Sequence, residues 1–487
     1  MKTLPVTENN LEEVITQFFL SLKYKHKDIK EWEEKISNQQ SILVYLLGVW
    51  LGDGCKTTST FGISVATTNI NFQNNLYKLI KKLVPTSKFS FRGGRTQICF
   101  FTNLFVLQHF FQFLLEKHFI SRYINNYEKQ FLAGFLDTDG SIYYGSQGKK
   151  YIKGLWKVEL YNYDLYKISL IKDILNKLII PYYFYNQKNY TTKQGYYVKN
   201  SYTIKSGGVY GYVLGKLIYP YLQNEEKKEK LNKLFSWLEN RIETYNLPVL
   251  EIFSSINGEG ISAGRPQLFI RVFGCNAFCV VCDTNYASNK KEQKYLKNIN
   301  KDGYKAVSLR ILCEIIKNSY LDEICLTGGE ITLYKDKTAC LIAYIRGLGK
   351  KVVLQTNGIC YDPIIYGLSN IVALDLKTPT MCPTYPIEQV YNNIKFLKPK
   401  DEIKTLVSNN QDWEFAKKIN MKVKEIGCTH IIQPLDLTNC LDKDIRKQKY
   451  LEKADWVIQQ LLKFKLFNAR ISLQLHKLVW GFDKRKV

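Results

Sequence analysis

The sequence predicts two folds in one chain of 487 residues, an α+β part followed from about residue 245 by an α/β part with a parallel sheet. In the first part, an apolar helical stretch that ends in Asp-Gly occurs twice, 86 residues apart. Each copy opens the same order of strand-like and helix-like segments, which indicates an internal repeat. In the second part, short apolar strands alternate with helical stretches, which is typical of βα units.

The N-terminal elements follow from hydrophobic periodicity. Residues 8–40 have the pattern of a charged amphipathic helix, so residues 1–40 are predicted to be a helical extension. The first repeat spans about 41–125, and its apolar helix ends in "LLGVWLGDG" (46–54). The second repeat begins at about 129, and its helix ends in "LAGFLDTDG" (132–140). Each helix is followed by strands, a further helix and further strands.

A charged helix over 222–244 closes the N-terminal part, and "YNLP" then breaks it. We therefore predict domains at 41–245 and 246–487. The expected strands of the second domain include "LFIRVF", "EICLTGG", "KVVLQTNG", "IVALDLK", "EIKTLV" and "HIIQPLD". Their alternation with helices predicts a parallel sheet, either open or barrel-like.

Charge and hydropathy narrow the class of protein. The net charge is +25, and residues 51–220 hold 22 basic against 8 acidic residues. This excess predicts a polyanion partner for the segment, although a Lys-rich genome would also produce it. No apolar run reaches the roughly 18 residues that span a bilayer. The N-terminus carries acids where a signal peptide has its apolar core. We expect a cytoplasmic protein that does not enter a membrane.

Three of the twelve cysteines stand close together in "GCNAFCVVCDT" (274–284), with the spacing C-x3-C-x2-C. A structural zinc site needs four ligands, usually in two close pairs, and no fourth Cys or His is adjacent. A [4Fe–4S] cluster held by three thiolates keeps one iron open for another ligand. The three thiols therefore favour a cluster over a zinc site. Isolated cysteines such as Cys313, Cys340 and Cys428 are expected to be core residues.

This stretch, directly after the strand "LFIRVFG", resembles the signature of the radical SAM enzymes. "LPVLEIFSSINGEG", "FIRVFGCN", "CDTNY", "LTGGE", "LQTNG" and "LQLHKLVWG" follow in the order and spacing of 7-carboxy-7-deazaguanine synthase. The resemblance covers nearly all of 246–487 and implies a partial (β/α) barrel. It also implies that 6-carboxy-5,6,7,8-tetrahydropterin becomes 7-carboxy-7-deazaguanine, in a queuosine-type pathway. The cofactors would be a [4Fe–4S] cluster, S-adenosylmethionine, cleaved to a 5′-deoxyadenosyl radical, and Mg2+.

The resemblance also assigns residues. Cys275, Cys279 and Cys282 would hold the cluster, and Thr284 would bind Mg2+ beside the substrate carboxylate. Substrate contacts would come from Glu259, Arg271 and Thr327. Cofactor contacts would come from Gly328, Gly329, Glu330 and Lys377, with Glu330 accepting from the ammonium of the methionine moiety. The resemblance implies an electron donor such as flavodoxin as a partner. A homodimer through this domain is possible in the same family. Another radical SAM activity is the alternative for this domain.

The sequence departs from the family at three places. Val281 stands before the third cysteine, where the family usually has an aromatic residue, so one wall of the adenine pocket is not accounted for. "GGEI" replaces Gly-Gly-Glu-Pro, and "DLK" (375–377) replaces Ser-Pro-Lys. These changes affect individual cofactor contacts and leave the predicted class of reaction unchanged.

The two helices that end in Asp-Gly predict a second site. Each has small residues four apart, Gly48 and Gly52 in the first and Gly134 and Thr138 in the second. Small residues at this spacing let two helix backbones pack closely. Packed together, the helices would bring Asp53 and Asp139 to one end. Two carboxylates there would bind divalent metal ions that activate water and stabilise the leaving oxygen of a phosphodiester.

The repeat resembles the two-motif LAGLIDADG homing endonucleases over about 41–240. The resemblance implies two αββαββα halves that form a saddle on double-stranded DNA, with Mg2+-dependent cleavage by Asp53 and Asp139. Basic residues expected near DNA are Lys81, Arg92, Arg95, Lys149, Lys157, Lys188 and Lys199. A passenger domain that binds DNA or RNA without cleaving is the alternative. Too few residues precede the first motif to predict a protein-splicing domain.

Overall fold

The computed structural model describes residues 11–21, 29–53, 62–67, 69–92, 98–102, 104–147, 151–191, 197–198, 200–287, 305–435, 442–466 and 468–482. The chain divides into two compact units, Met1–Trp237 and Leu238–Val487. This division falls inside helix α10 (Glu225–Thr244), a few residues before the predicted limit at 245. The domain limits 1–40, 41–245 and 246–487 stay predictions.

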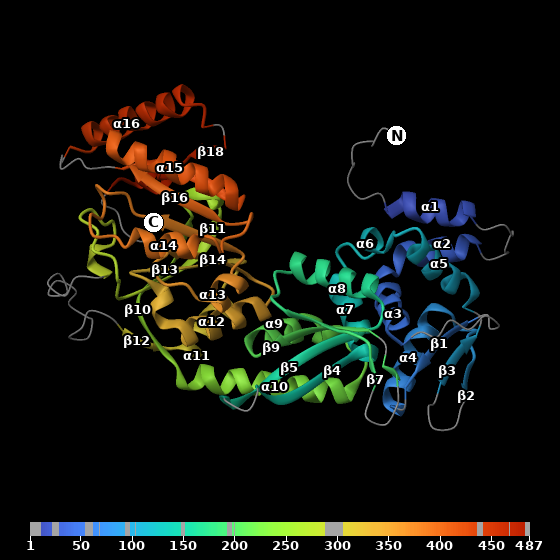
Figure 1. Ribbon diagram of the computed structural model, residues 1–487. Helices are drawn as coiled ribbons and strands as arrows, with labels where there is room; N and C mark the ends of the chain where they lie inside the picture. Colours follow the sequence, from blue (N-terminus) through green and yellow to red (C-terminus); the bar gives the residue numbers. More distant parts are fainter. Residues whose placement is uncertain are drawn as a thin grey trace. The chain divides into compact units, whose positions relative to one another are not determined.

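The N-terminal unit is built from helices and short antiparallel sheets (Figure 1). Its helices before α10 are α1 (Leu11–Ser21), α2 (Ile29–Asn38), α3 (Gln40–Asp53), α4 (Ile70–Leu83), α5 (Phe105–Glu116), α6 (Ile120–Tyr123), α7 (Glu128–Asp139), α8 (Leu165–Lys177) and α9 (Val209–Ile218), with a 3-10 turn η1 (Tyr219–Tyr221). Its strands are β1 (Gly62–Ala66), β2 (Phe89–Arg92), β3 (Ile98–Thr102), β4 (Gly140–Gln147), β5 (Tyr151–Asn162), β6 (Tyr183–Gln187), β7 (Tyr190–Thr191), β8 (Tyr197–Val198) and β9 (Ser201–Gly207).

The repeat predicted from the sequence is visible in the order of these elements. The second half runs α7, β4, β5, α8, β6, β9, α9, as the αββαββα pattern requires, with the small hairpin β7–β8 before β9. The first half has one described strand, β1, between α3 and α4, and residues 54–61 lie outside the described part. The sheet orders are β1-β3-β2 and β4-β5-β9-β6. A joint saddle of the two sheets stays a prediction.

Helices α3 and α7 pack closely, and their glycines explain why. A Cβ atom built on Gly48 would lie 2.2 Å from the carbonyl oxygen of Phe131, and one built on Gly134 would lie 2.1 Å from that of Tyr45. Each glycine of one helix therefore faces the backbone of the other, as the spacing of small residues predicts. Most described residues of both helices are buried, so this pair contributes to the core of the unit.

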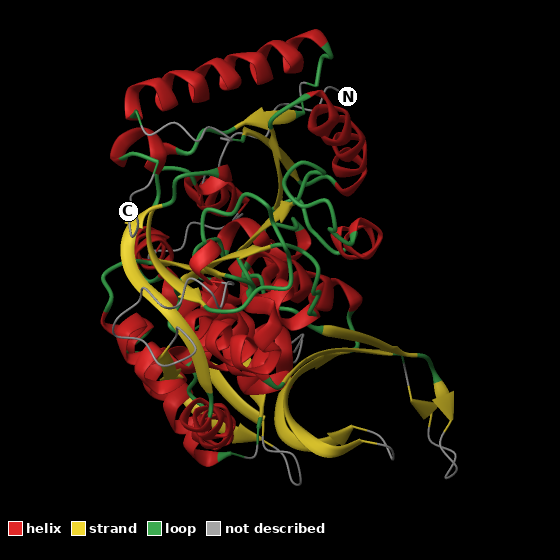
Figure 2. Cartoon of the chain, turned by 90° about the vertical axis from the view of Figure 1, so that its left-hand side faces the viewer, coloured by secondary structure: helices red, strands yellow, loops and turns green. Residues whose placement is uncertain are grey.

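The C-terminal unit has one nine-stranded sheet in the order β12-β10-β11-β13-β14-β15-β16-β17-β18. Its strands are β10 (Asn246–Ile256), β11 (Pro266–Val272), β12 (Lys305–Ser308), β13 (Glu323–Gly328), β14 (Lys351–Thr356), β15 (Ile371–Leu376), β16 (Glu402–Val407), β17 (Thr429–Pro434) and β18 (Ala469–Ile471). From β11 to β18 neighbouring strands are parallel, whereas β10 pairs antiparallel with both β11 and β12. Long strands of the chain are bent (Figure 2), as expected of twisted sheets.

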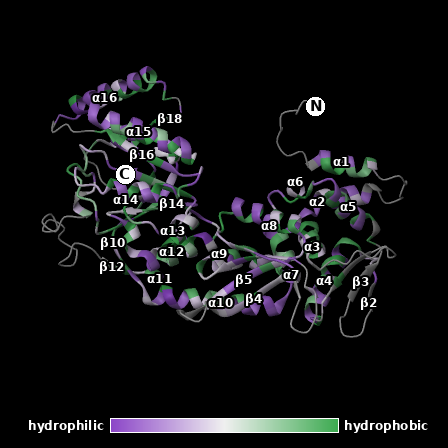
Figure 3. Ribbon diagram, viewed as in Figure 1, coloured by the Kyte–Doolittle hydropathy of each residue, from purple (hydrophilic) through white to green (hydrophobic). Residues whose placement is uncertain are grey.

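Along the chain, a helix lies between each parallel strand and the next, as in βα units. The helices of this unit are α11 (Leu309–Asn318), α12 (Lys335–Gly347), α13 (Pro363–Leu368), α14 (Ile387–Ile394), α15 (Asn410–Ile426), α16 (Lys443–Lys463) and α17 (Leu475–Trp480), with 3-10 turns η2 (Gly260–Ser262), η3 (Asn285–Ala287) and η5 (Ile331–Tyr334). Hydrophilic and hydrophobic residues alternate along α16 (Figure 3), as in an amphipathic helix. The six predicted strands are confirmed as β11 and β13 to β17, and barrel-like closure stays a prediction. No helix of the described residues is long and apolar enough to cross a membrane.

Candidate active site

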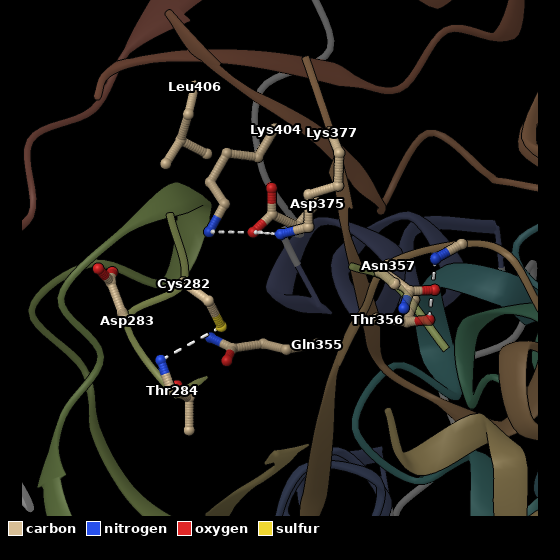
Figure 4. Close-up of polar contacts among 12 residues, drawn as sticks. Cys282, Asp283, Thr284, Gln355, Thr356, Asn357, Asp375, Lys377, Lys404 and Leu406 are labelled. Atoms are coloured by element: carbon tan, nitrogen blue, oxygen red, sulfur yellow. Dashed lines mark hydrogen bonds and ion pairs between the residues drawn. The ribbon is translucent and has the colours of Figure 1, made fainter. Parts of the chain in front are cut away.

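A cavity of about 600 Å³ opens at the carboxyl ends of the parallel strands in the C-terminal unit. Its walls include the next-to-last residues of β11, β13, β14 and β15, namely Arg271, Thr327, Gln355 and Asp375, together with Lys404 from β16. The carboxyl ends of parallel strands are where α/β sheets place their ligand sites. Figure 4 shows side chains of this cavity that come from four separate segments of the chain.

The three predicted cluster cysteines line this cavity. Cys275, Cys279 and Cys282 are partly exposed free thiols. The backbone N–H groups of Ala277 and Thr284 donate to the sulfurs of Cys275 and Cys282, each over 3.4 Å. Burial raises the pKa of all three thiols, in Cys279 to about 12, while the ammonium of Lys377 acts in the opposite direction. Within the described ranges, no three His, Cys, Asp or Glu residues are grouped closely enough for a single metal ion.

Two glycines at the end of β13 let the cysteine loop pack closely against this strand. Gly328 has φ of +136°, a backbone conformation that glycine adopts readily and other residues rarely adopt. A Cβ atom on Gly328 would lie 2.3 Å from the backbone nitrogen of Val272. A Cβ on Gly329 would lie 2.0 Å from the carbonyl oxygen of Gly274. The N–H groups of Gly329 and Glu330 donate to the carbonyls of Val272 and Gly274 over 2.9 and 2.7 Å. Both glycines line the cavity.

Glu330 lies behind the glycines, fully buried, and is not among the cavity-lining residues. Its carboxylate accepts from the backbone and hydroxyl of Thr332, from the hydroxyl of Thr356 and from the backbone of Asn357. Burial raises the pKa of Glu330, and these hydrogen bonds partly offset the rise. Through these hydrogen bonds Glu330 connects the end of β13 to the end of β14. Its contact with a methionine ammonium stays a prediction.

Four side chains of alternating charge form a chain in the wall of the cavity, and three of them, Lys404, Asp375 and Lys377, are labelled in Figure 4. Lys404 Nζ lies 2.9 Å from Glu259 Oε2 and 3.6 Å from Asp375 Oδ2, which lies 2.8 Å from Lys377 Nζ. Burial raises the pKa values of Glu259 and Asp375, but the neighbouring lysines more than offset this and hold both below their usual range. The pKa values of Lys377 and Lys404 are raised, because the carboxylates outweigh burial. All four groups are therefore charged near neutral pH.

The predicted substrate residues Glu259, Arg271 and Thr327 line the same cavity. Arg271 pairs with Glu251 over 3.2 Å and donates through a guanidinium nitrogen to the hydroxyl of Thr284 over 3.0 Å. The hydroxyl of Thr327 donates to Gln355 over 2.8 Å. Apart from Glu330, the predicted residues of this domain all line the one cavity. They are Glu259, Arg271, Cys275, Cys279, Cys282, Thr284, Thr327, Gly328, Gly329 and Lys377.

Several lining residues were missed by the sequence analysis. Lys404 was quoted only as part of a strand, and Asp375 only in a strand and in the departure "DLK", although a charge within an apolar strand is itself a signal of a site. The segment "LQLHKLVWG" was used for family resemblance without any role for its residues. In the structure, Gln474 and Lys477 bind the carboxylate of Asp283 over 3.2 and 3.0 Å, so the C-terminal segment holds the cysteine loop.

The end of the α3–α7 pair is the second predicted site. Asp139 ends α7, is half-buried and accepts a hydrogen bond from the amide of Asn162 on β5. Asp53 ends α3, and its side chain lies outside the described part of the structure. The packing of Gly52 against Thr138 places the two helix ends side by side. The predicted juxtaposition of the two helix ends is thereby confirmed, and a metal site there stays a prediction.

Three of the predicted DNA-contacting residues have described side chains. Lys81 donates to the carbonyl of Pro85, Lys157 lies over the ring of Tyr143, and Lys188 is exposed. The side chain of Arg92, and the whole of Arg95, Lys149 and Lys199, lie outside the described residues.

Comparison with known proteins finds relatives of the C-terminal half. A 7-carboxy-7-deazaguanine synthase from Thermoplasma acidophilum is 29% identical over 234 residues, which are 48% of this chain and 97% of the relative. One from Clostridium acetobutylicum is 28% identical over 244 residues, 50% of this chain and 100% of the relative. The predicted resemblance of this half to the synthases is confirmed. No protein-family model matches the sequence.

Solved structures similar to the chain include both families that the sequence resembles. QueE from Escherichia coli is 21% identical, with a TM-score of 0.35, and the match covers 47% of this chain and 95% of QueE. Variants of the homing endonuclease I-DmoI are 16% identical, with a TM-score of 0.26, and the match covers 38% of this chain and 98% of theirs.

Proposed function

We propose that the C-terminal half is a radical SAM lyase that converts 6-carboxy-5,6,7,8-tetrahydropterin to 7-carboxy-7-deazaguanine. The observation that carries the proposal is the single cavity on which three free thiols, two glycines and a chain of four charges converge. Relatives of that name align with nearly the whole of this half, which supports the same activity.

The residues fit a [4Fe–4S] cluster and S-adenosylmethionine. Three thiols line one cavity, two of them receive backbone N–H donors, and hydrogen bonds to sulfur are typical of cluster ligands. Cys275, Cys279 and Cys282 would hold the cluster, and Gly328 and Gly329 leave room for the amino-acid end of the cofactor. When bound, the cluster supplies the electron that cleaves S-adenosylmethionine.

The chain's own residues would bind and orient the pterin. The guanidinium of Arg271 suits a carboxylate, and the hydroxyl of Thr284 beside it is an oxygen ligand of the kind that Mg2+ takes. Asp375 Oδ1 is buried without a hydrogen-bond partner in the described structure, so it is placed to accept from a ring N–H of the substrate. Lys404 and Lys377 keep that carboxylate ionised.

The further parts of this proposal are the Mg2+ requirement, a flavodoxin-type electron donor, a homodimer and a cytoplasmic location. They come from the resemblance and the sequence, and each is open to a direct measurement.

Cluster reconstitution tests the proposal. Under anaerobic conditions the full chain should bind about four irons, and Ala at Cys275, Cys279 or Cys282 should abolish that binding. Cys360→Ala is the matched control, since Cys360 is also a partly exposed free thiol but does not line the cavity. A triple variant of the three cysteines that retains a full cluster would show that the assignment is wrong.

We further propose that the N-terminal half is a Mg2+-dependent, site-specific DNA endonuclease. The packed ends of α3 and α7, each finishing in an aspartate, support it, as does the basic excess of residues 51–220. Asp53→Asn or Asp139→Asn should remove cleavage of a pooled target library and spare most binding, because phosphate contacts supply most of the affinity. Binding by the wild-type chain without any cleavage in Mg2+ or Mn2+ would favour the non-cleaving passenger instead.

A further inference from the structure

Glu402 is a buried carboxyl group next to the wall of the cavity. It lies on β16 two residues before Lys404, so the two side chains point to the same face of the sheet. β16 pairs with β15 so that Glu402 stands beside Ala373 and Lys404 stands beside Asp375. Ala373, Asp375 and Lys404 line the cavity, whereas Glu402 is 4% exposed and does not. Glu402 therefore lies behind the cavity wall.

The carboxylate of Glu402 contacts the loop that carries Glu259. Its Oε2 atom accepts a hydrogen bond from the backbone N–H of Ile261 over 2.6 Å. Gly260 has φ of +73°, and a Cβ atom on it would lie 2.1 Å from Glu402 Oε1. A side chain at this position would therefore keep the carboxylate away from the backbone. Glu402 thus holds the two residues that directly follow Glu259.

Glu259 itself reaches the cavity. Its Oε2 atom lies 2.9 Å from Lys404 Nζ, and its side chain lines the cavity wall. Glu402 and Lys404 therefore hold Glu259 from the same strand, one through the backbone of the loop and the other through the carboxylate. Ser472 adds a contact from outside β16, since its hydroxyl accepts from the N–H of Gly260 over 3.0 Å. The place of Glu259 in the cavity thus depends largely on β16.

We infer that Glu402 is a positioning residue for the pterin, because its ionised carboxylate holds the loop in the place where Glu259 contacts the substrate. The inference rests on the proposed function, since it concerns the substrate-binding residues of that site. An ionised acceptor binds an N–H group more strongly than a neutral one, so the hydrogen bond from Ile261 is stronger when Glu402 is charged. Affinity for the pterin should therefore follow the protonation of Glu402.

The protonation of Glu402 changes near neutral pH. Burial raises the pKa of its carboxyl to about 7, and the carboxylates of Glu259 and Asp375 act in the same direction. The N–H of Ile261 and the ammonium of Lys404 lower this pKa and partly offset the rise. The carboxyl is thus mostly neutral at pH 6 and mostly ionised at pH 8. Its hydrogen bond to the loop becomes stronger as the pH rises through 7.

The inference is tested by equilibrium binding of 6-carboxy-5,6,7,8-tetrahydropterin to the cluster-loaded full chain, without reductant so that no turnover occurs. Glu402→Gln keeps an acceptor of the same shape and removes the charge. The Kd of this variant should be close to that of the wild type at pH 6 and roughly fivefold higher at pH 8. In the complete reaction its kcat at saturating pterin should be unchanged, because the contact made by Glu259 contributes to binding.

Asp401→Asn is the matched control. Asp401 is 2% exposed, and its carboxylate accepts from the backbone N–H groups of Val372 and Lys398 over 2.9 and 2.8 Å. It does not line the cavity, and neither partner belongs to the loop of Glu259. This variant also loses a buried charge that binds backbone N–H groups, so it should be less stable. Its Kd for the pterin should equal that of the wild type at both pH values.

A ratio of the Kd of Glu402→Gln to that of the wild type that does not rise from pH 6 to pH 8 would overturn the inference, as would an equal rise in Asp401→Asn. Should Glu402→Gln fail to hold its cluster, Gly260→Ala serves instead, because its Cβ moves the loop away from the carboxylate. Its Kd should be raised at both pH values, and an unchanged Kd would overturn the inference. Wild-type protein that holds its cluster but binds no pterin would contradict the proposed function.

Discussion

Asp137 and Asp139 stand two residues apart in "LAGFLDTDG", yet the structure gives them opposite surroundings. Asp137 is buried, and one of its oxygens accepts from the hydroxyl of Tyr45 on α3 over 2.6 Å and from the backbone N–H of Gln223 over 2.7 Å. Asp139 is half-buried at the helix end. The sequence predicted the acid at the helix end, whereas the structural role of Asp137 depends on partners far away in the chain.

The buried carboxyl of Asp137 makes the free energy of unfolding depend on pH. Burial raises the pKa of its carboxyl to about 6, despite the hydrogen bonds that act the other way, from 3.8 in the unfolded chain. The folded protein therefore retains a proton that the unfolded chain releases. The stability that this group contributes is complete below pH 4 and is lost as the pH rises through 6, by up to about 3 kcal/mol.

Asp137→Asn removes this titration. We expect the free energy of unfolding of the wild type, relative to the variant, to fall as the pH rises from 4.5 to 7.5. Urea unfolding, monitored by hydrogen exchange of peptides from α3 and α7, measures this difference in the free energy of unfolding at each pH. A difference that stays constant, or that grows in favour of the wild type, would show that the carboxyl is ionised throughout this range.

At the scale of elements, periodicity predicted six strands, β11 and β13 to β17, because buried parallel strands are short apolar runs between helices. It did not predict β10 and β12, the antiparallel edge of the same sheet. Only Leu247 and Val249 of β10 are buried, most of its other residues are half-buried, and it contains Pro248, so it lacks the pattern of a short buried strand. The spacing of glycines, in contrast, was sufficient to predict that α3 packs on α7.

That packing gives a stability prediction. An added methyl group at Gly134 would lie 2.1 Å from the carbonyl oxygen of Tyr45, so Gly134→Ala must separate the two helices and should cost about 3 kcal/mol or more. Gly207→Ala is the control, since its Cβ would approach no atom closer than 3.7 Å. Thermal unfolding of the two variants checks this. Equal melting temperatures for the two would contradict the packing of α3 on α7.

At the scale of the whole molecule, the chain joins two candidate sites whose proposed chemistries differ. The residues of the cavity lie between Phe253 and Phe482, and Asp53 and Asp139 end two helices of the other unit, so the residues of each candidate site lie within one compact unit. The cavity itself was only partly predictable. The cysteines, glycines and Arg271 belong to short motifs, as do Asn357 in "LQTNG" and Asp375 in "DLK". Lys404 belongs to no such motif and reaches the site because β16 lies beside β15, where Lys404 pairs with Asp375.

Turnover by residues 246–487 alone tests the central claim most directly. This fragment, with its cluster reconstituted anaerobically, should convert 6-carboxy-5,6,7,8-tetrahydropterin to 7-carboxy-7-deazaguanine in the presence of S-adenosylmethionine and a reductant. Its rate should be near that of the full chain, and Asp53→Asn and Asp139→Asn in the full chain should leave the rate unchanged. A full chain that makes no such product would contradict the synthase proposal, and an inactive fragment beside an active full chain would contradict the independence of the two halves.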